Sequence, residues 1–232
     1  MKKILLLIIA LLTVLSCIGC NYEIVTPDEV KTQYDEQGRI VVEGIPDRPG
    51  SYYKYVYDEN GRRQKRLEYL TVDQEEPYSE AIYYYEGDTL THTIGKSKDG
   101  TTEKALYHKN GNIKISTSYD ADMKIIGVSE FNEQGEIIRI DLYRNGIIDK
   151  SQHYDPKCKN AEHYLVGADF YDDNGRLIKS SKTTFDEDGT SHNKTYLYDE
   201  ETGRMYMARY LVVKNEDIIL EERYDVNGQP IN

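Results

Sequence analysis

The sequence predicts an all-β protein: an extended antiparallel meander of about a dozen strands, built from short hairpin repeats into one curled or twisted sheet. Three observations predict it, namely a recurring turn phrase, apolar–polar alternation between the turns, and the composition. The chain has 22 tyrosines, three phenylalanines, no tryptophan and 17 glycines. Abundant tyrosine, threonine, isoleucine and valine beside little leucine and alanine is typical of strands.

The turn phrase is an aromatic residue, three mostly polar residues and a glycine. It occupies residues 34–38, 57–61, 107–111, 131–135, 171–175, 185–189 and 224–228. Glycine enters the left-handed conformation without a Cβ clash, and Asp or Asn side chains bond the nearby amides. We therefore expect hairpin turns at seven glycines: Gly38, Gly61, Gly111, Gly135, Gly175, Gly189 and Gly228.

The segments between the turns alternate with a period of two, as strands do. Ile113 and Ile115 share one face with Tyr119, and Tyr53 shares one with Tyr55. Both faces are only weakly apolar. We therefore expect the sheet to depend on cross-strand aromatic pairs rather than on a thick core.

The first residues have the pattern of a secretory signal. Lys2 and Lys3 precede residues 4–15, which are apolar except for Thr13, and small residues follow before a cysteine. A membrane-spanning helix needs about 20 apolar residues, so this segment predicts export rather than a span. We expect residues 1–16 to be removed as a signal peptide.

Residues 14–17, Val-Leu-Ser-Cys, resemble the lipobox of bacterial prolipoproteins. The resemblance implies that the Cys17 thiol carries a diacylglycerol and holds the protein to a membrane, on the exported side of the cell envelope. Cys20 is the alternative anchor, and an ordinary secretory signal cleaved nearby is the alternative to lipidation. The sequence does not distinguish the inner from the outer membrane.

The predicted organisation is a signal peptide at 1–16, an anchor, linker and first degenerate repeat at 17–50, and a β-hairpin repeat domain at 51–232. Residues 45–50 carry two prolines and look like the linker. Only Cys158 remains beyond the two candidate anchor residues, so the repeat domain has no cysteine pair for a disulfide of its own.

The charge argues against some partners. The net charge is −12, and loss of Lys2 and Lys3 with the signal makes it −14. An acidic surface disfavours nucleic acid and anionic lipid heads.

Two constellations could carry chemistry. His153, Cys158 and His163 lie near Asp155, but their spacing matches no known zinc motif, and we expect a solvated loop. The acidic phrases at 172–175 and 186–189 lack the earlier ligands of a calcium loop. We therefore expect no metal, no cofactor and no catalytic residues. The tyrosines could stack on sugar rings or a partner, or pack across strands; residues 83–85 place rings on both faces.

The full phrase Tyr-Asp-x-x-Gly-Arg, at 34–39, 57–62 and 171–176, resembles the YD-repeat (Rhs-type) proteins of bacteria. The chain is also similar to variant MORN-repeat proteins, some of which are labelled antitoxin or immunity components. It departs from both: it lacks the many repeats and terminal toxin domain of Rhs shells, and the tryptophan of MORN repeats. The resemblance implies a non-enzymatic scaffold that offers a binding surface to a protein or glycan. The alternative is an immunity protein that neutralises a toxin.

Overall fold

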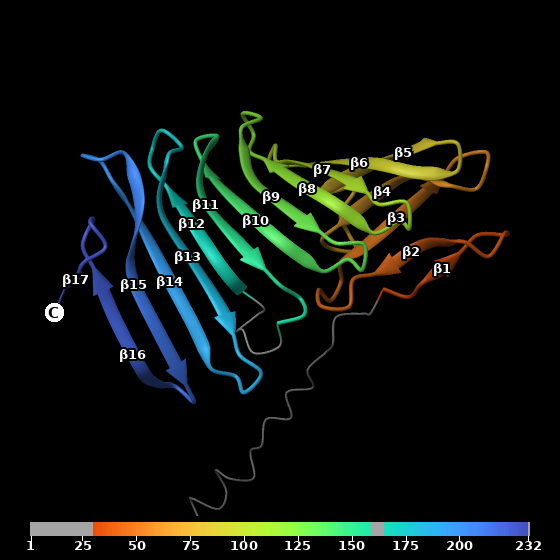
Figure 1. Ribbon diagram of the computed structural model, residues 1–232. Helices are drawn as coiled ribbons and strands as arrows, with labels where there is room; N and C mark the ends of the chain where they lie inside the picture. Colours follow the sequence, from red (N-terminus) through yellow and green to blue (C-terminus); the bar gives the residue numbers. More distant parts are fainter. Residues whose placement is uncertain (1–29, 159–164, 232) are drawn as a thin grey trace, which may run out of the picture.

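The computed structural model describes residues 30–158 and 165–231, which form seventeen strands in one antiparallel sheet (Figure 1). Each strand pairs with the next along the chain, so the sheet is a meander from β1 to β17. The predicted all-β antiparallel meander is confirmed. Within these residues no helix is long and apolar enough to cross a membrane.

The first nine strands are β1 (Gln33–Tyr34), β2 (Ile40–Gly44), β3 (Tyr52–Tyr57), β4 (Arg63–Tyr69), β5 (Ser79–Glu86), β6 (Thr89–Ser97), β7 (Thr102–Tyr107), β8 (Ile113–Tyr119) and β9 (Ile125–Phe131). The others are β10 (Ile137–Arg144), β11 (Ile147–Tyr154), β12 (Leu165–Tyr171), β13 (Leu177–Phe185), β14 (Ser191–Asp199), β15 (Arg204–Lys214), β16 (Asp217–Tyr224) and β17 (Pro230–Ile231).

The sheet is a single open layer. Figure 1 shows the strand direction turning steadily from β16 to β5, which is the ordinary twist of a wide sheet. Among the residues that the structure describes, no second layer packs against the sheet, and few apolar side chains are buried. The buried apolar residues are Tyr52, Tyr55, Tyr69, Ala81, Ala105, Ala168 and Val212. Tyrosine and alanine thus take the place of the leucine-rich core of a two-layer domain.

One hydrogen-bond arrangement builds six of the turns. In the turn after β3, one oxygen of the Asp58 carboxylate accepts from the amides of Asn60 at 3.0 Å and Arg62 at 2.8 Å. The Gly61 amide donates to the Asp58 carbonyl at 3.0 Å. The side chains that repeat this arrangement are Asp35, Asp120, Asn132, Asp172 and Asp225. The phrase therefore specifies its turn by bonds that lie within five residues.

The seven phrase glycines all have φ between 76° and 87°, in the left-handed region. Other turns also have residues in the left-handed region, although they lack the phrase. Met123 has φ 63°. In two turns a pair of consecutive residues has positive φ: Asn145 (53°) with Gly146 (79°), and Asn215 (50°) with Glu216 (71°). Two consecutive residues at positive φ make a type I′ hairpin turn. These tight turns, together with the two-residue strands β1 and β17, raise the strand number above the dozen expected.

Residues 45–50 join β2 to β3, with the Ile45 amide donating to the Ser51 carbonyl at 3.0 Å. β2 and β3 pair directly, so the strands before and after this segment belong to the same sheet. Cys17 and Cys20 lie outside the described residues, as does His163.

Candidate binding surface

A cluster of tyrosines and arginines covers one face of strands β3 to β7. We call it the tyrosine–arginine platform; its members are Tyr53, Tyr55, Arg63, Arg66, Tyr83 and Tyr107. The register places them together. Tyr55 lies opposite Arg66, Arg66 lies opposite Ala81, and Tyr83 follows two residues later on the same face.

Each of the two arginines lies over a tyrosine ring. The guanidinium carbon of Arg63 is 4.3 Å from the centre of the Tyr55 ring, and that of Arg66 is 4.6 Å from the centre of the Tyr53 ring. The two rings are themselves 6.3 Å apart and tilted by 50°. A cation at this distance is attracted by the negative face of the ring, which holds both guanidinium groups in place on the sheet.

Two of the tyrosine hydroxyls are held by side chains on the same face of the sheet. The Tyr55 hydroxyl donates to the Glu43 carboxylate at 2.7 Å, and the Tyr107 hydroxyl lies 3.2 Å from that of Thr93. Burial, followed by the hydrogen bond to Glu43, raises the pKa of Tyr55 far above its ordinary value. Burial raises the pKa of Tyr107 as well. Both phenols therefore stay neutral at physiological pH.

The two platform arginines have no carboxylate within ion-pair distance among the described residues. Their neighbours do: Arg62 pairs with Asp58 at 2.8 Å, and Lys65 pairs with Glu80 at 2.6 Å. Four of the five residues 62–66 are basic, although the whole chain carries a net charge of −12. The sequence analysis did not single out this basic run, which is the signal that could have pointed to the platform. The tyrosine stripe alone indicated the face but not its charge.

A hollow of about 290 Å³ adjoins the platform at Arg66. Small side chains line it, namely Ser79, Ala81, Gly95, Ser97 and Ser118. The lining also contains three carboxylates, Glu68, Glu80 and Glu103, together with Lys96, Tyr119 and Ile126. Glu68 accepts from Ser79 at 2.8 Å and from Arg48 at 3.0 Å. Glu103 accepts from Ser116 at 2.6 Å through one of its oxygens. The hollow thus places hydrogen-bond acceptors beside Arg66.

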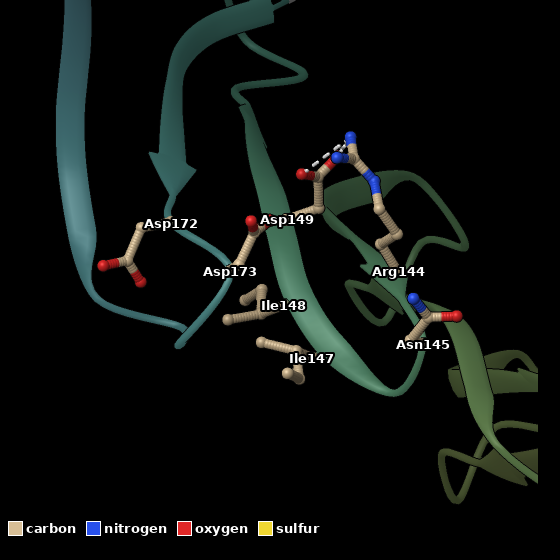
Figure 2. Close-up of a pocket in the computed structure, with 7 residues that line it drawn as sticks. All are labelled: Arg144, Asn145, Ile147, Ile148, Asp149, Asp172 and Asp173. Carbon is tan, nitrogen blue, oxygen red and sulfur yellow. Dashed lines mark hydrogen bonds and ion pairs between the residues drawn. The ribbon is translucent and has the colours of Figure 1, made fainter.

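A second hollow, of about 330 Å³, lies where the middle strands end, between the β10–β11 hairpin and the turn after β12 (Figure 2). Three of its four charged side chains are already engaged. Asp149 pairs with Arg144 at 3.1 Å, and an oxygen of Asp172 accepts two amides of its own turn. Ile147 and Ile148 lie between the two turns in Figure 2. We interpret this hollow as a gap between neighbouring turns.

The histidine–cysteine segment is not assembled as a metal centre in the part of the chain described. His153 lies on β11, where its Nε2 is 2.9 Å from the Asp169 carboxylate. Cys158 lies in a turn in which its amide donates to the Asp155 carbonyl. Within 30–158 and 165–231, no three His, Cys, Asp or Glu side chains converge to hold a metal ion.

A serine on the same face as His153 is also engaged elsewhere. The hydroxyl of Ser151, which is fully buried, donates to the Asp141 carboxylate. That carboxylate also accepts from Arg139 at 2.8 Å. Ser151 therefore forms a buried polar contact that holds β10 to β11, not a pair with a histidine base.

The tyrosine triplet places rings on both faces of β5. Tyr83 belongs to the platform. Tyr84 lies on the opposite face, stacked on His92 with ring centres 4.4 Å apart, and remains 38% exposed.

No known family model matches the chain, and no curated protein matches it. The chain is similar to the GtfA/B complex bound to UDP and GlcNAc at 9% identity and a TM-score of 0.31, over 48% of this chain and 22% of that one. It is similar to a porin-like protein from Bacteroides uniformis at 10% identity and a TM-score of 0.28, over 70% and 88%. A TcdB2–TccC3 toxin structure matches at 10% identity and 0.19, over 86% and 17%. The chain spans about a fifth of the first structure's length, and at these TM-scores none of the likenesses bears on function.

Proposed function

We propose that this chain is a non-enzymatic lipoprotein, held to a bacterial membrane through Cys17, whose repeat sheet presents the tyrosine–arginine platform to a protein or glycan at the cell envelope. Two observations support the anchor: Lys2 and Lys3 precede the apolar segment 4–15, and residues 14–17 have the Val-Leu-Ser-Cys pattern. A lipid anchor leaves the sheet on the exported side, where it faces other envelope components.

One observation carries the binding role. Arg63 and Arg66 stack on tyrosine rings on an open face and have no carboxylate partner among the described residues, in a chain that is otherwise acidic. A protein can neutralise a surface cation cheaply with a neighbouring carboxylate, as Arg62 and Lys65 show. Arginine and tyrosine are also the residues enriched where binding energy concentrates. Cations held rigid and left unpaired favour recognition of an external group.

Binding to arrays of envelope proteins and glycans tests this function. The full chain in detergent would be compared with an Arg63→Gln/Arg66→Gln variant and with Arg176→Gln, which changes an arginine that is 70% exposed at a distant turn. We expect a reproducible ligand that the double variant loses and the control retains. A ligand that all three proteins hold equally would exclude the platform as the binding surface.

A further inference from the structure

We propose that the platform recognises a carboxylate-bearing polysaccharide of the uronic acid type, with a sugar carboxylate held by Arg63 and Arg66 and the adjoining sugar hydroxyls in the hollow beside Arg66. This inference rests on the proposed function and adds the chemical class of the ligand. It follows from three features of the platform: what covers the rings, what lines the hollow, and how the face continues.

The first feature is that the arginines cover the rings. Each guanidinium lies within 5 Å of a ring centre, and Tyr55 as a whole residue is 9% exposed. A neutral sugar binds aromatic residues by stacking on an open ring face, and on Tyr55 that face is already occupied. What remains accessible is the edge of the guanidinium, which carries its N–H donors. These donors match a carboxylate, to which arginine binds through two parallel hydrogen bonds.

The second feature is the mixed charge beside Arg66. Glu68 and Glu103 line the hollow, and Glu103 uses only one of its oxygens for Ser116. Carboxylates accept hydrogen bonds from hydroxyl groups but repel a ligand whose polar groups are all anionic. An acidic peptide or a nucleic acid would bring further negative charge against these two groups. A uronic sugar brings one carboxylate and several hydroxyls in each unit, which suits two cations followed by acceptors.

The third feature is the surface of strands β6 to β9 beside the platform. Thr93 lies opposite Ala105, Ala105 opposite Ser116, and Ser116 opposite Ser129, so small side chains follow one another on this face from β6 to β9. Such a row does not itself bind a ligand. Thr93 and Ala105 are buried, at 8% and 4% exposed, and Ser116 and Ser129 are half-buried, so an extended polymer would contact this row at its β8 and β9 end.

Isothermal titration of the full chain in detergent with polygalacturonate tests the inference, with two matched probes beside it. Its methyl ester keeps the sugar hydroxyls and removes the charge, and polyglutamate keeps the carboxylates on a peptide. We expect polygalacturonate to bind, and both other probes to bind at least tenfold more weakly. The Arg63→Gln/Arg66→Gln variant should lose at least tenfold in affinity, and Arg176→Gln should keep the affinity of the unaltered chain.

The Arg63→Lys/Arg66→Lys variant guards against a folding defect, because it keeps the charge and loses only the planar fork. It should bind with intermediate affinity and melt near the unaltered chain. Equal binding of the ester would overturn the carboxylate assignment and leave a glycan-binding platform standing. Preferred binding of polyglutamate would assign the platform to an acidic protein. Failure of the unaltered chain to bind polygalacturonate would overturn the inference, while the array experiment still decides the proposed function.

Discussion

The guanidinium of Arg39 lies 4.4 Å from the centre of the Tyr57 ring, and the hydroxyl of Tyr57 donates to the carbonyl oxygen of Ile40 at 2.7 Å. The next repeat reproduces both contacts: Arg62 lies 4.8 Å from the Tyr85 ring, and the Tyr85 hydroxyl donates to the Arg63 carbonyl at 2.9 Å. The arginine that ends one phrase is thus covered by the tyrosine of the next hairpin. These residues tie successive turns together along one edge of the sheet.

Removal of the Tyr57 hydroxyl tests this tie. Tyr57→Phe keeps the ring under Arg39 and loses the bond to Ile40, so the free energy of unfolding should fall by about 1 kcal/mol. Tyr57→Leu also loses the cation–π contact and should cost more. Urea melts measure both. Tyr34→Phe is the control, because Tyr34 lies in the edge strand β1 and is 62% exposed. Equal effects at 34 and 57 would contradict the tie.

The turn glycines make a second prediction. Gly175 has φ 76° and a Cβ there would lie 3.4 Å from Ile147 Cγ2, so Gly175→Val should cost on the order of 1 to 3 kcal/mol. Asn tolerates this conformation and should cost clearly less. The same pair at Gly61, with the same φ, should behave alike, and Gly38 separates backbone strain from contact because no atom lies within 4 Å of its Cβ position. Small, equal costs for valine and asparagine would exclude left-handed turns.

The turn aspartates make a third prediction, on acid stability. The backbone amide of Arg176, more than any other group, lowers the pKa of Asp172. A carboxyl whose pKa is lower in the folded state stabilises the fold above its unfolded pKa of about 3.9, and the contribution is lost as the pH falls through the folded value. Asp172→Asn keeps the acceptor oxygen and cannot titrate. Its melting temperature should therefore decline less than that of the unaltered chain as the pH falls below about 4.

Asn132 supplies the reciprocal test. It already holds its turn as an amide, accepting from Gln134 at 3.0 Å and Glu136 at 2.9 Å. The Asn132 amide group also donates to the Glu136 carboxylate at 2.8 Å, so the substitution is made together with Glu136→Gln. In that background Asn132→Asp should leave the neutral-pH melting temperature nearly unchanged and add acid sensitivity. If neither substitution altered the pH dependence, the turn carboxylates would not control acid unfolding.

The lipid anchor makes a fourth prediction. Cys17→Ala should abolish metabolic labelling by a fatty-acid analogue, because it removes the thiol to which the diacylglycerol is attached, and Cys20→Ala should leave the label intact. Label that disappears only with Cys20 would move the anchor by three residues. Label that survives both single changes and the double change would exclude the lipoprotein assignment.

The turns were predictable from the sequence because their determinants are local. Asp58, Gly61 and Arg62 fix one turn among themselves, so a pattern of five or six residues contains the whole arrangement. The platform was predictable only in part. Tyr53 and Tyr55 were expected to share a face, but their arginine partners come from β4 through the hairpin register. Residue spacing along the chain does not give that register. Whether a carboxylate lies within ion-pair distance of Arg63 depends on the arrangement of the whole sheet.

The meander of β1 to β17 gives the molecule a modular construction. Every strand bonds only to the strands before and after it in the chain, and no second layer has to match it. Folding therefore closes short loops one after another, and stability is carried by nearest-neighbour units, as in other repeat arrays. Hydrogen exchange should be fastest at the two ends and slowest in the middle strands. A whole hairpin can be inserted or deleted between turns without a rearranged core, so proteins of this design can differ in length by complete units.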